Sequence, residues 1–304
     1  MILVISSPQD PMGVGIAEAL AAAGAESMFF SVHDIPGEIR LAFGSTPDQD
    51  AFVLGGERIA CNRIQAIYHR VGFSNFQVYE EYSDQEVVHV NHQCQSALVG
   101  WLNNFPGLVV NRPRAASSNA SKPYQIRLIA EAGLAVPATV VTNREQQARF
   151  FYEEQEGEVI FKSISYQRSI VQKMQEQDLD RLEQLQHCPL QLQSYVPGFD
   201  VRVHVVGSYG VFASRIESQK SDYRYDKESE IVAWDLPDEL AERCQSLARS
   251  LELPLAGLDL RFTPEGEVCC FEVNPSPAFG WYENRTGQPI SEALAAMLLA
   301  GRAW

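Results

Sequence analysis

The start of the chain follows a strand–helix–strand pattern, which strongly limits how the protein can fold. Residues 2–5 (ILVI) form a short apolar run typical of a buried strand. An Ala-rich stretch at 16–23 ends at Gly24, a frequent residue at helix C-termini, and another apolar run follows at 27–32. Because strands joined through a helix pair in parallel, we expect a parallel sheet in the N-terminal region.

The segment between this strand and this helix, residues 6–15, is rich in Pro and Gly and is predicted to be a loop. Its string Gly13-Val14-Gly15 lacks the third glycine of a dinucleotide-binding loop. An oxidoreductase that uses this loop for a cofactor is therefore a poor alternative.

Beyond this start, short strands alternate with helices, and a polar, irregular stretch at 111–123 marks a boundary. We expect three parts, at 1–115, 116–190 and 191–304, the first α/β and the other two α+β lobes. Helices are predicted at 84–102, 124–132, 144–154, 175–187, 237–251 and 290–299. Strands are predicted within 38–68, with a hairpin at Gly55-Gly56, and at 108–111, 138–142, 158–163 and 190–196. Further strands are predicted as two hairpins, 200–206 with 209–216, turning at Gly207-Ser208, and 256–263 with 268–273.

Composition restricts the classes of partner. The 304 residues include 24 Lys+Arg and 39 Asp+Glu, and this net charge of −15 repels phosphate backbones and argues against nucleic-acid binding. No apolar run approaches the roughly 20 residues of a membrane span, and the start lacks the basic region of a signal peptide. The 6 cysteines include no CxxC pair, which favours buried, reduced thiols. We therefore expect a cytoplasmic protein without a membrane partner.

Acidic and amide side chains come together in a predicted hairpin near the C-terminus. Asp259 lies in GLDLRF, and Glu272 and Asn274 lie in CFEVNPSP. Residues two apart on a strand share a face, so Glu272 and Asn274 project together, and the hairpin brings Asp259 alongside. Hard oxygen ligands of this kind suit Mg²⁺, usually shared with substrate phosphates. The alternative is an ordinary hairpin with solvated acids.

Isolated basic residues form a second group: Lys122, Lys162, Arg202 and Arg215. Each stands in mostly apolar surroundings, where a charge needs a partner. Phosphate groups suit both residue types, since Arg makes bidentate contacts and Lys acts as a point charge. A surface ion pair would explain any one of them, but four of them beside a metal site favour phosphate binding.

The order and spacing of these motifs resemble the ATP-grasp superfamily, in its RimK-like branch, over nearly the whole chain. The resemblance implies an ATP-grasp fold behind an N-terminal parallel-sheet (pre-ATP-grasp) domain. It also implies an ATP-dependent carboxylate–amine or carboxylate–hydroxyl ligase that works through an acyl phosphate. The segments that carry it are 110–143, EVIFKS (158–163), LQLQSYVPGFDVRVHVVG (190–207), GVFASRIES (210–218), GLDLRF (257–262) and FEVNPSPAFGWYE (271–283).

The same resemblance implies a role for each site residue. It assigns the nucleotide phosphates to Lys122 and Lys162, and adenine to the backbone of the interlobe segment Gln193, Ser194, Tyr195 and Val196, where Ser194 replaces a common Glu. It assigns the family's Asp-x-Arg motif to Asp200, at the nucleotide, and Arg202, and a place near the transferred phosphate to Arg215. It assigns Mg²⁺, for which Mn²⁺ is a substitute, to Asp259, Glu272 and Asn274.

Three further stretches resemble peptide-modifying ligases of the microviridin, or graspetide, type, which make ω-ester and ω-amide crosslinks. They are HDIPGEI (33–39), AIYHRVGF (66–73) and WYENRTGQPISEAL (281–294). One departure is Pro275-Ser276-Pro277, where those ligases tend to show Gly-Gln-Trp after the metal-binding Asn. We expect a peptide carboxylate as substrate and the polar loop 218–230 as a lid that admits it. The alternatives are a small-molecule or amino-acid ligase and an inactive fold that serves as a binding partner, and a homo-oligomer is left open.

Overall fold

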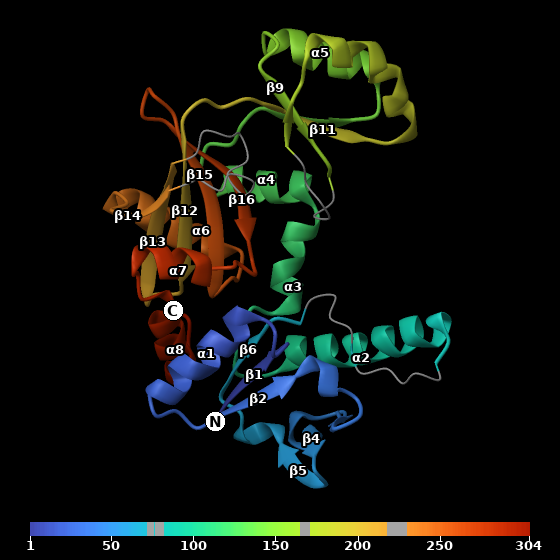
Figure 1. Cartoon of the computed structure of the whole chain (residues 1–304), viewed down its shortest axis with the longest axis vertical. Helices are drawn as coiled ribbons and strands as arrows, with labels where there is room; N and C mark the ends of the chain where they lie inside the picture. The colour runs from blue at the N-terminus through green and yellow to red at the C-terminus, as the bar shows by residue number, and fades with distance from the viewer. Residues whose placement is uncertain (72–75, 77–81, 165–170, 218–229) are drawn as a thin grey trace.

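The computed structural model describes residues 1–71, 76, 82–164, 171–217 and 230–304. Within these ranges the strands form a parallel N-terminal sheet, a small antiparallel sheet beside it, a second antiparallel sheet in the middle of the sequence and a third near the C-terminus. Figure 1 shows the N-terminal sheet at the bottom, the C-terminal sheet at the centre left and the middle sheet at the top.

The N-terminal sheet is parallel, as the strand–helix–strand pattern predicts. Every residue of its first strand is buried, so both faces need cover. Helix α2 (Asp84–Asn104) packs on one face, and α1 (Pro11–Ala22) packs on the other. In spatial order the strands are β2 (Ser27–Ser31), β1 (Ile2–Ser6), β6 (Ala66–His69) and β7 (Leu108–Val110).

Helix α8 (Ile290–Ala300), at the other end of the chain, also covers this sheet. It packs beside α1, and its Leu294 and Leu298 share a buried core with Ile2 and Val4 of β1. The last helix therefore returns to the first strand and ties the C-terminal part of the chain to the N-terminal sheet (Figure 1).

Helix α1 begins earlier than predicted. The expected loop 6–15 ends at Asp10, because the Asp10 side chain accepts the Met12 N–H and Pro11 occupies the first helical turn. Gly13 and Gly15, which suggested a loop, lie inside the helix. A good N-cap and a well-placed proline outweigh the poor helix propensity of the glycines.

A small antiparallel sheet stands beside the parallel one. Its last two strands form the hairpin predicted at Gly55-Gly56. After β7, short helical turns lead into α4 (Lys122–Glu131), which lies beside β16, below the middle sheet, in Figure 1. The remaining elements here are β3 (Ile39–Ala42), β4 (Ala51–Leu54), β5 (Glu57–Ala60), α3 (Pro113–Ala116) and the 3₁₀ turns Val32–Asp34, Pro47–Gln49, Cys61–Arg63 and Ser117–Ala120.

The middle sheet is covered on one face by α5 (Glu145–Glu154) and by a 3₁₀ segment, Glu176–His187. The sequence predicts an ordinary helix for the second of these. Its buried residues Leu182 and Leu185 are three apart, which is the repeat of a 3₁₀ helix. The strands, in spatial order, are β10 (Gln172–Lys173), β9 (Val159–Lys162), β11 (Leu190–Ser194) and β8 (Thr139–Thr142).

The C-terminal sheet contains both predicted hairpins, β12–β13 and β15–β16. Helix α6 (Asp238–Ser250) packs on one of its faces. The edge strand β14 and helix α7 (Gly280–Thr286) were not predicted, because neither shows a clear apolar period. In spatial order the strands are β14 (Glu230–Trp234), β13 (Gly210–Glu217), β12 (Phe199–Val206), β15 (Leu255–Phe262) and β16 (Val268–Asn274).

Gly198, between β11 and β12, occupies a position that a larger residue cannot take. Its φ is +135°, and a Cβ atom built on it lies 1.9 Å from the Phe262 carbonyl oxygen. We expect Gly198→Ala to lower the free energy of unfolding by about 3 kcal/mol, measured by chemical denaturation. Gly100→Ala is the control, because that exposed helical site has open space and should gain slight stability. Equal stability of the two variants would contradict the prediction.

The cysteines form no disulfide, as expected. Cys61, Cys94, Cys244 and Cys270 are buried, and burial raises the pKa of the Cys61 and Cys244 thiols to about 12. Cys188 is exposed, so the prediction of uniformly buried thiols is wrong for that residue. None of the described helices combines the length and the apolar character that crossing a membrane requires.

Candidate active site

The acidic residues meet on one face of the C-terminal sheet. Asp259 lies directly opposite Glu272 in the ladder of β15 and β16, and Asn274 lies opposite Gly257. Residues that are opposed in this way project from the same face. All three polar side chains are partly exposed. The hairpin therefore presents two carboxylates and one amide side by side, the geometry that strand alternation predicts.

Gly257 has no side chain, and this leaves room for Arg202 and Pro277 beside the acidic residues. A Cβ atom at this position would lie 2.8 Å from Cβ of Pro277 and 2.9 Å from Nη1 of Arg202. The Arg202 Nη1 instead donates a hydrogen bond to the Gly257 carbonyl at 3.2 Å. Nothing in the sequence pattern singled out this glycine, because its importance depends on contacts with distant segments.

Arg202 supplies a cation on the same face. It lies opposite Asp259 in the ladder of β12 and β15, and its Nε is 3.1 Å from Oδ1 of Asp259. The guanidinium also lies over the ring of Tyr282, 5.7 Å from its centroid. The Arg202 side chain is only 12% exposed, so these contacts hold it in a defined orientation.

The two predicted lysines approach from other elements. Lys122 begins α4 and is 6% exposed, and Lys162 ends β9 and is 7% exposed. The Lys122 Nζ donates to the Ser163 carbonyl at 3.3 Å, and the Lys162 Nζ donates to Oε1 of Gln193 at 3.2 Å. In the described part of the chain no carboxylate forms an ion pair with Lys162.

Burial and neighbouring charges of both signs influence the pKa of Lys162. Burial and the nearby positive charge of Lys122 lower the pKa of Lys162 from 10.5 to about 8. Glu272 and Asp259 act in the opposite direction, so their charges reach this ammonium. Lys162 lies on the middle sheet, whereas Lys122 begins α4, which packs against β16, so the two lysines come from different parts of the fold.

Gln125 is a site residue that the sequence analysis missed. Its amide, on α4 and 2% exposed, donates to the Val273 carbonyl at 2.7 Å and accepts the Val273 N–H at 3.0 Å. Val273 separates Glu272 from Asn274, so Gln125 fixes the strand that carries both. The only available signal was its place one helical turn after Lys122.

The interlobe segment follows the end of β11. Gln193 is buried, accepts from Lys162 and donates to Oγ1 of Thr139 at 3.0 Å. The Ser194 N–H donates to the Ala138 carbonyl, and the Tyr195 N–H donates to the Glu158 carbonyl. These two N–H groups are therefore engaged within the protein. The adenine contact implied for this segment stays a prediction.

Asp200 lies beside this segment and forms an ion pair. The Arg261 guanidinium donates to both Asp200 carboxylate oxygens at 2.8 Å, and its Nη1 donates to the Val196 carbonyl at 3.0 Å. The Asp200–Arg261 pair therefore holds the connection between the lobes. The nucleotide contact implied for Asp200 stays a prediction.

Arg215 does not join the other cations. Arg202 lies opposite Ser214, so the next residue of β13, Arg215, projects from the other face of the sheet with Val201. There its guanidinium lies over the Phe199 ring, 4.3 Å from the centroid, and 3.3 Å from Glu217. The expectation that all four cations converge is corrected: the structure gathers Lys122, Lys162 and Arg202.

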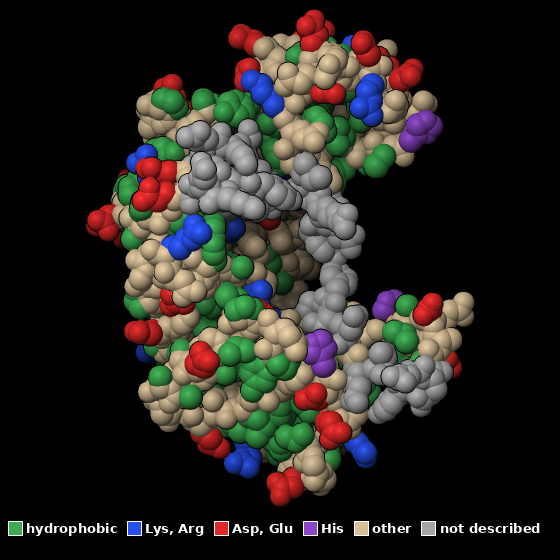
Figure 2. All heavy atoms as spheres, in the orientation of Figure 1, with side chains coloured by type: hydrophobic (Ala, Val, Ile, Leu, Met, Phe, Trp, Pro, Cys, Tyr) green, Lys and Arg blue, Asp and Glu red, His purple; other side chains and the backbone are tan. Residues whose placement is uncertain are grey.

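The donor set fits a hard divalent cation and phosphate groups. Among the described residues no three His, Cys, Asp or Glu side chains are placed to hold a metal by themselves. Asp259 and Glu272 would therefore need the Asn274 amide and oxygens of a bound phosphate to complete a Mg²⁺ shell. Figure 2 shows that this face of the molecule is deeply hollowed between its upper and lower parts, with Lys or Arg side chains in the hollow.

Comparison with known proteins gives the family. A family model described as RimK-like ATP-grasp domain matches residues 119–298, more than half of the chain. The chain belongs to the RimK-like ATP-grasp family. A curated relative, the probable alpha-L-glutamate ligase of Mannheimia succiniciproducens, is 26% identical over 208 residues, 64% of this chain and 68% of the relative.

Solved ATP-grasp ligases match over almost the entire chain. The ATP-grasp ligase PsnB, complexed with a phosphomimetic variant of its minimal precursor, Mg and ADP, is 28% identical, with a TM-score of 0.85 and coverage of 99% of this chain and 98% of that one. The macrocyclase MdnC of Microcystis aeruginosa, bound with its precursor peptide MdnA, has a TM-score of 0.86 at 22% identity, with 98% and 99% covered. The ATP-grasp fold expected from the sequence is thereby confirmed.

Proposed function

We propose that this RimK-like ATP-grasp protein is an ATP- and Mg²⁺-dependent ligase that activates a peptide side-chain carboxylate as an acyl phosphate. One observation carries the proposal. Asp259, Glu272 and Asn274 share a sheet face with Arg202, and the charges of Asp259 and Glu272 reach Lys162 on the middle sheet. Phosphoryl transfer needs this combination of positioning and charge neutralisation.

Each group has a defined task in this proposal. Lys122 from α4 and Lys162 from the middle sheet hold the nucleotide phosphates, and Asp259, Glu272 and Asn274 face them from the C-terminal sheet. A bound Mg²⁺ supplies charge neutralisation at the phosphate oxygens, and Mn²⁺ would substitute for it. Arg202, oriented by Asp259, stabilises the negative charge of the transferred phosphoryl group and of the acyl phosphate.

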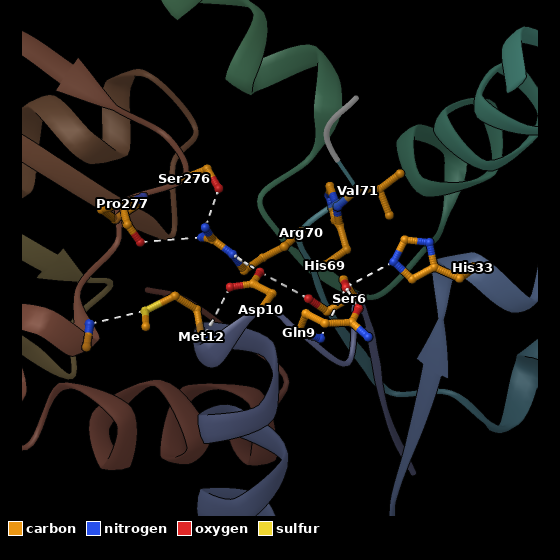
Figure 3. A network of polar contacts seen from close by, with 12 residues as sticks. Ser6, Gln9, Asp10, Met12, His33, His69, Arg70, Val71, Ser276 and Pro277 are labelled. Carbon is orange, nitrogen blue, oxygen red and sulfur yellow. Dashed lines mark hydrogen bonds and ion pairs between the residues drawn. The ribbon is translucent and has the colours of Figure 1, made fainter. Parts of the chain in front are cut away.

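A peptide substrate is supported by the relatives and by the N-terminal sheet. PsnB, whose structures are complexed with its precursor, matches 99% of the chain at 28–29% identity, whereas the glutamate ligase matches 64% of it. Two of the stretches that resemble peptide-modifying ligases, 33–39 and 66–73, begin just after β2 and within β6, and their described residues include the carboxyl-terminal edge of the parallel sheet. Figure 3 shows His33 and Arg70 at this edge. Ligands of open parallel sheets bind at the carboxyl ends of the strands.

The test is an assay with ATP, Mg²⁺ and a short Thr/Ser- and Asp/Glu-rich peptide encoded beside the gene. We expect release of ADP and phosphate, loss of one water from the peptide for each bond formed, and a hydroxamate when hydroxylamine intercepts the acyl phosphate. AMP and pyrophosphate as products would contradict the acyl-phosphate route.

An amino-acid ligase is the second candidate, because of the similarity to the probable glutamate ligase. It predicts a product that gains the mass of an added residue, in place of the loss of water. The inactive-fold alternative predicts no ATP turnover with any acceptor. The lid predicted at 218–230 falls almost wholly outside the described residues, so alanine variants at Tyr223 and Arg224 remain its test.

Nucleotide affinity should depend on pH through Lys162. The pKa of Lys162 is about 8 in the free protein, and a bound phosphate raises it, so binding takes up a proton. ATP affinity should therefore fall as pH rises above about 8, by up to about tenfold per pH unit, in calorimetric titrations. Lys162→Met should weaken binding and abolish this slope. Lys173→Met, at an exposed lysine paired with Glu158 just before β9, should leave both unchanged. A slope that survives in Lys162→Met would assign it to another group.

A further inference from the structure

The segment that follows Asn274 cannot be held by ordinary sheet hydrogen bonds. It reads Pro275-Ser276-Pro277, and the two prolines have no N–H to donate to a ladder. Ser276 has the only N–H of these three residues, and it donates to Oδ1 of Asn274 at 2.8 Å. This bond orients the Asn274 side chain, so the position of Ser276 determines how Asn274 is presented.

Donors from the N-terminal sheet hold this segment instead. The Arg70 Nη1 donates to Oγ of Ser276 at 3.0 Å and to the Pro277 carbonyl at 3.4 Å (Figure 3). The Asn111 Nδ2 donates to the Pro275 carbonyl at 2.5 Å. Each of the three residues after Asn274 is therefore bound by a side chain that lies more than 150 positions earlier in the chain.

Arg70 is itself held firmly. It follows β6, forms an ion pair with Asp10 and has a side chain that is 18% exposed. Asp10 is the N-cap of α1 and also accepts from Oγ of Ser6 and from the Met12 N–H, both at 3.1 Å. Asp10 therefore holds the Arg70 guanidinium in place at the carboxyl end of the parallel sheet, as Figure 3 shows.

Asn111 is also fixed, at the end of β7. It is 6% exposed, and its amide donates to the Leu255 carbonyl at 2.6 Å and accepts the Leu255 N–H at 3.1 Å. The Nε2 of His69 is 2.6 Å from the Asn111 carbonyl, and burial lowers the pKa of His69 to about 4, so a neutral ring donates there. Asn111 thus joins the start of β15 to the residue that follows β16.

We propose that Arg70 and Asn111 are positioning residues for the metal site: they fix the Pro275–Pro277 segment so that Asn274 faces Asp259 and Glu272. This inference rests on the proposed function, because it takes Asn274 as a Mg²⁺ ligand. It also explains how the side chain of Asn274, the last residue of β16, keeps its orientation although the Pro-Ser-Pro segment after it cannot continue the strand. Partners of metal ligands that act in this way are typically worth 10- to 100-fold in affinity.

The test measures Mn²⁺ binding by electron paramagnetic resonance with ADP present, which needs no turnover. We expect Arg70→Met to weaken Mn²⁺ binding by about tenfold, and the exposed Ser276→Ala to weaken it less. In the double variant the two losses of Mn²⁺ affinity should not add, because each substitution removes the same hydrogen bond between Arg70 and Ser276. Arg63→Met, which breaks an exposed ion pair with Glu26 in the same domain, should bind Mn²⁺ like the parent protein.

Glu272→Ala separates this inference from the proposed function. Loss of Mn²⁺ binding in Glu272→Ala with unchanged binding in both Arg70→Met and Ser276→Ala would overturn the inference alone. Unchanged binding in Glu272→Ala would instead overturn the metal site of the proposed function. If Arg70→Met lowers only the unfolding temperature, and the folded protein keeps its Mn²⁺ affinity, Arg70 has a structural role and the inference is wrong. ADP binding without metal should stay the same in Arg70→Met and Ser276→Ala, which reports an intact nucleotide site.

Discussion

Replacement of Glu272 by alanine is expected to lower ATP turnover with the proper acceptor by on the order of 10³-fold. Glu272 lies directly opposite Asp259, so its loss removes one of the two carboxylates that face the phosphates. The remaining oxygen donors cannot hold Mg²⁺ in the same way, and the charge of the phosphates is then poorly neutralised. The loss should fall mainly on kcat, measured as ADP release under saturating ATP.

The same substitution has a second expected effect, on Lys162. The Glu272 charge supports the protonated form of Lys162, so its removal should lower the pKa of that ammonium further. The pH at which ATP affinity begins to fall should therefore shift downward. Glu265→Ala, in the exposed turn of the same hairpin, is the control and should leave turnover and this pH unchanged. Near-normal turnover of Glu272→Ala, or lost stability with full activity in the folded fraction, would show that Glu272 is only structural.

The parts of the site that were predictable depend on local rules. Glu272 and Asn274 share a face because a strand alternates its side chains, and Asp259 joins them because a short turn returns the chain antiparallel. The parallel sheet followed in the same way from a strand–helix–strand start. In these cases the relevant geometry is set within a few residues, so the sequence pattern is sufficient.

The position of Arg215 could not be predicted from these local rules. Whether it lies beside Arg202 or behind it depends on the register between β12 and β13, and a shift of one residue exchanges the faces. The hairpin at Gly207-Ser208 was predicted, but its register was not worked out. The structure pairs Arg202 with Ser214, and this places Arg215 on the opposite face.

The supporting residues were not predictable for a different reason. Gln125 binds Val273 across 148 positions, and Asn111 binds Leu255 across 144. An isolated buried amide has no sequence signature, since its partner is a backbone group that any residue could provide. Helix α8 is similar: its apolar residues predict that it packs, and only the fold shows that it packs on β1 and α1.

Arg202→Met is expected to lower kcat by about 10²–10³-fold, with a smaller effect on ATP affinity. Arg202 lies on the same sheet face as Asp259 and Glu272. Asp259, the Gly257 carbonyl and the Tyr282 ring hold its guanidinium in a defined orientation. Methionine keeps much of the buried stem and removes the charge, so the loss reports on transition-state stabilisation.

Arg202→Lys should recover only part of this loss, because an ammonium cannot reproduce the contacts of Nε and Nη1 at the same time. Arg243→Met, at an exposed ion pair on α6, is the neutral control. Arg215→Met is the informative comparison: from the far face of the sheet it should cost much less in kcat than Arg202→Met. Equal losses for Arg202→Met and Arg215→Met would mean that the transferred phosphate is not stabilised from the Asp259 face, and a fully active Arg202→Met would remove Arg202 from the catalytic group.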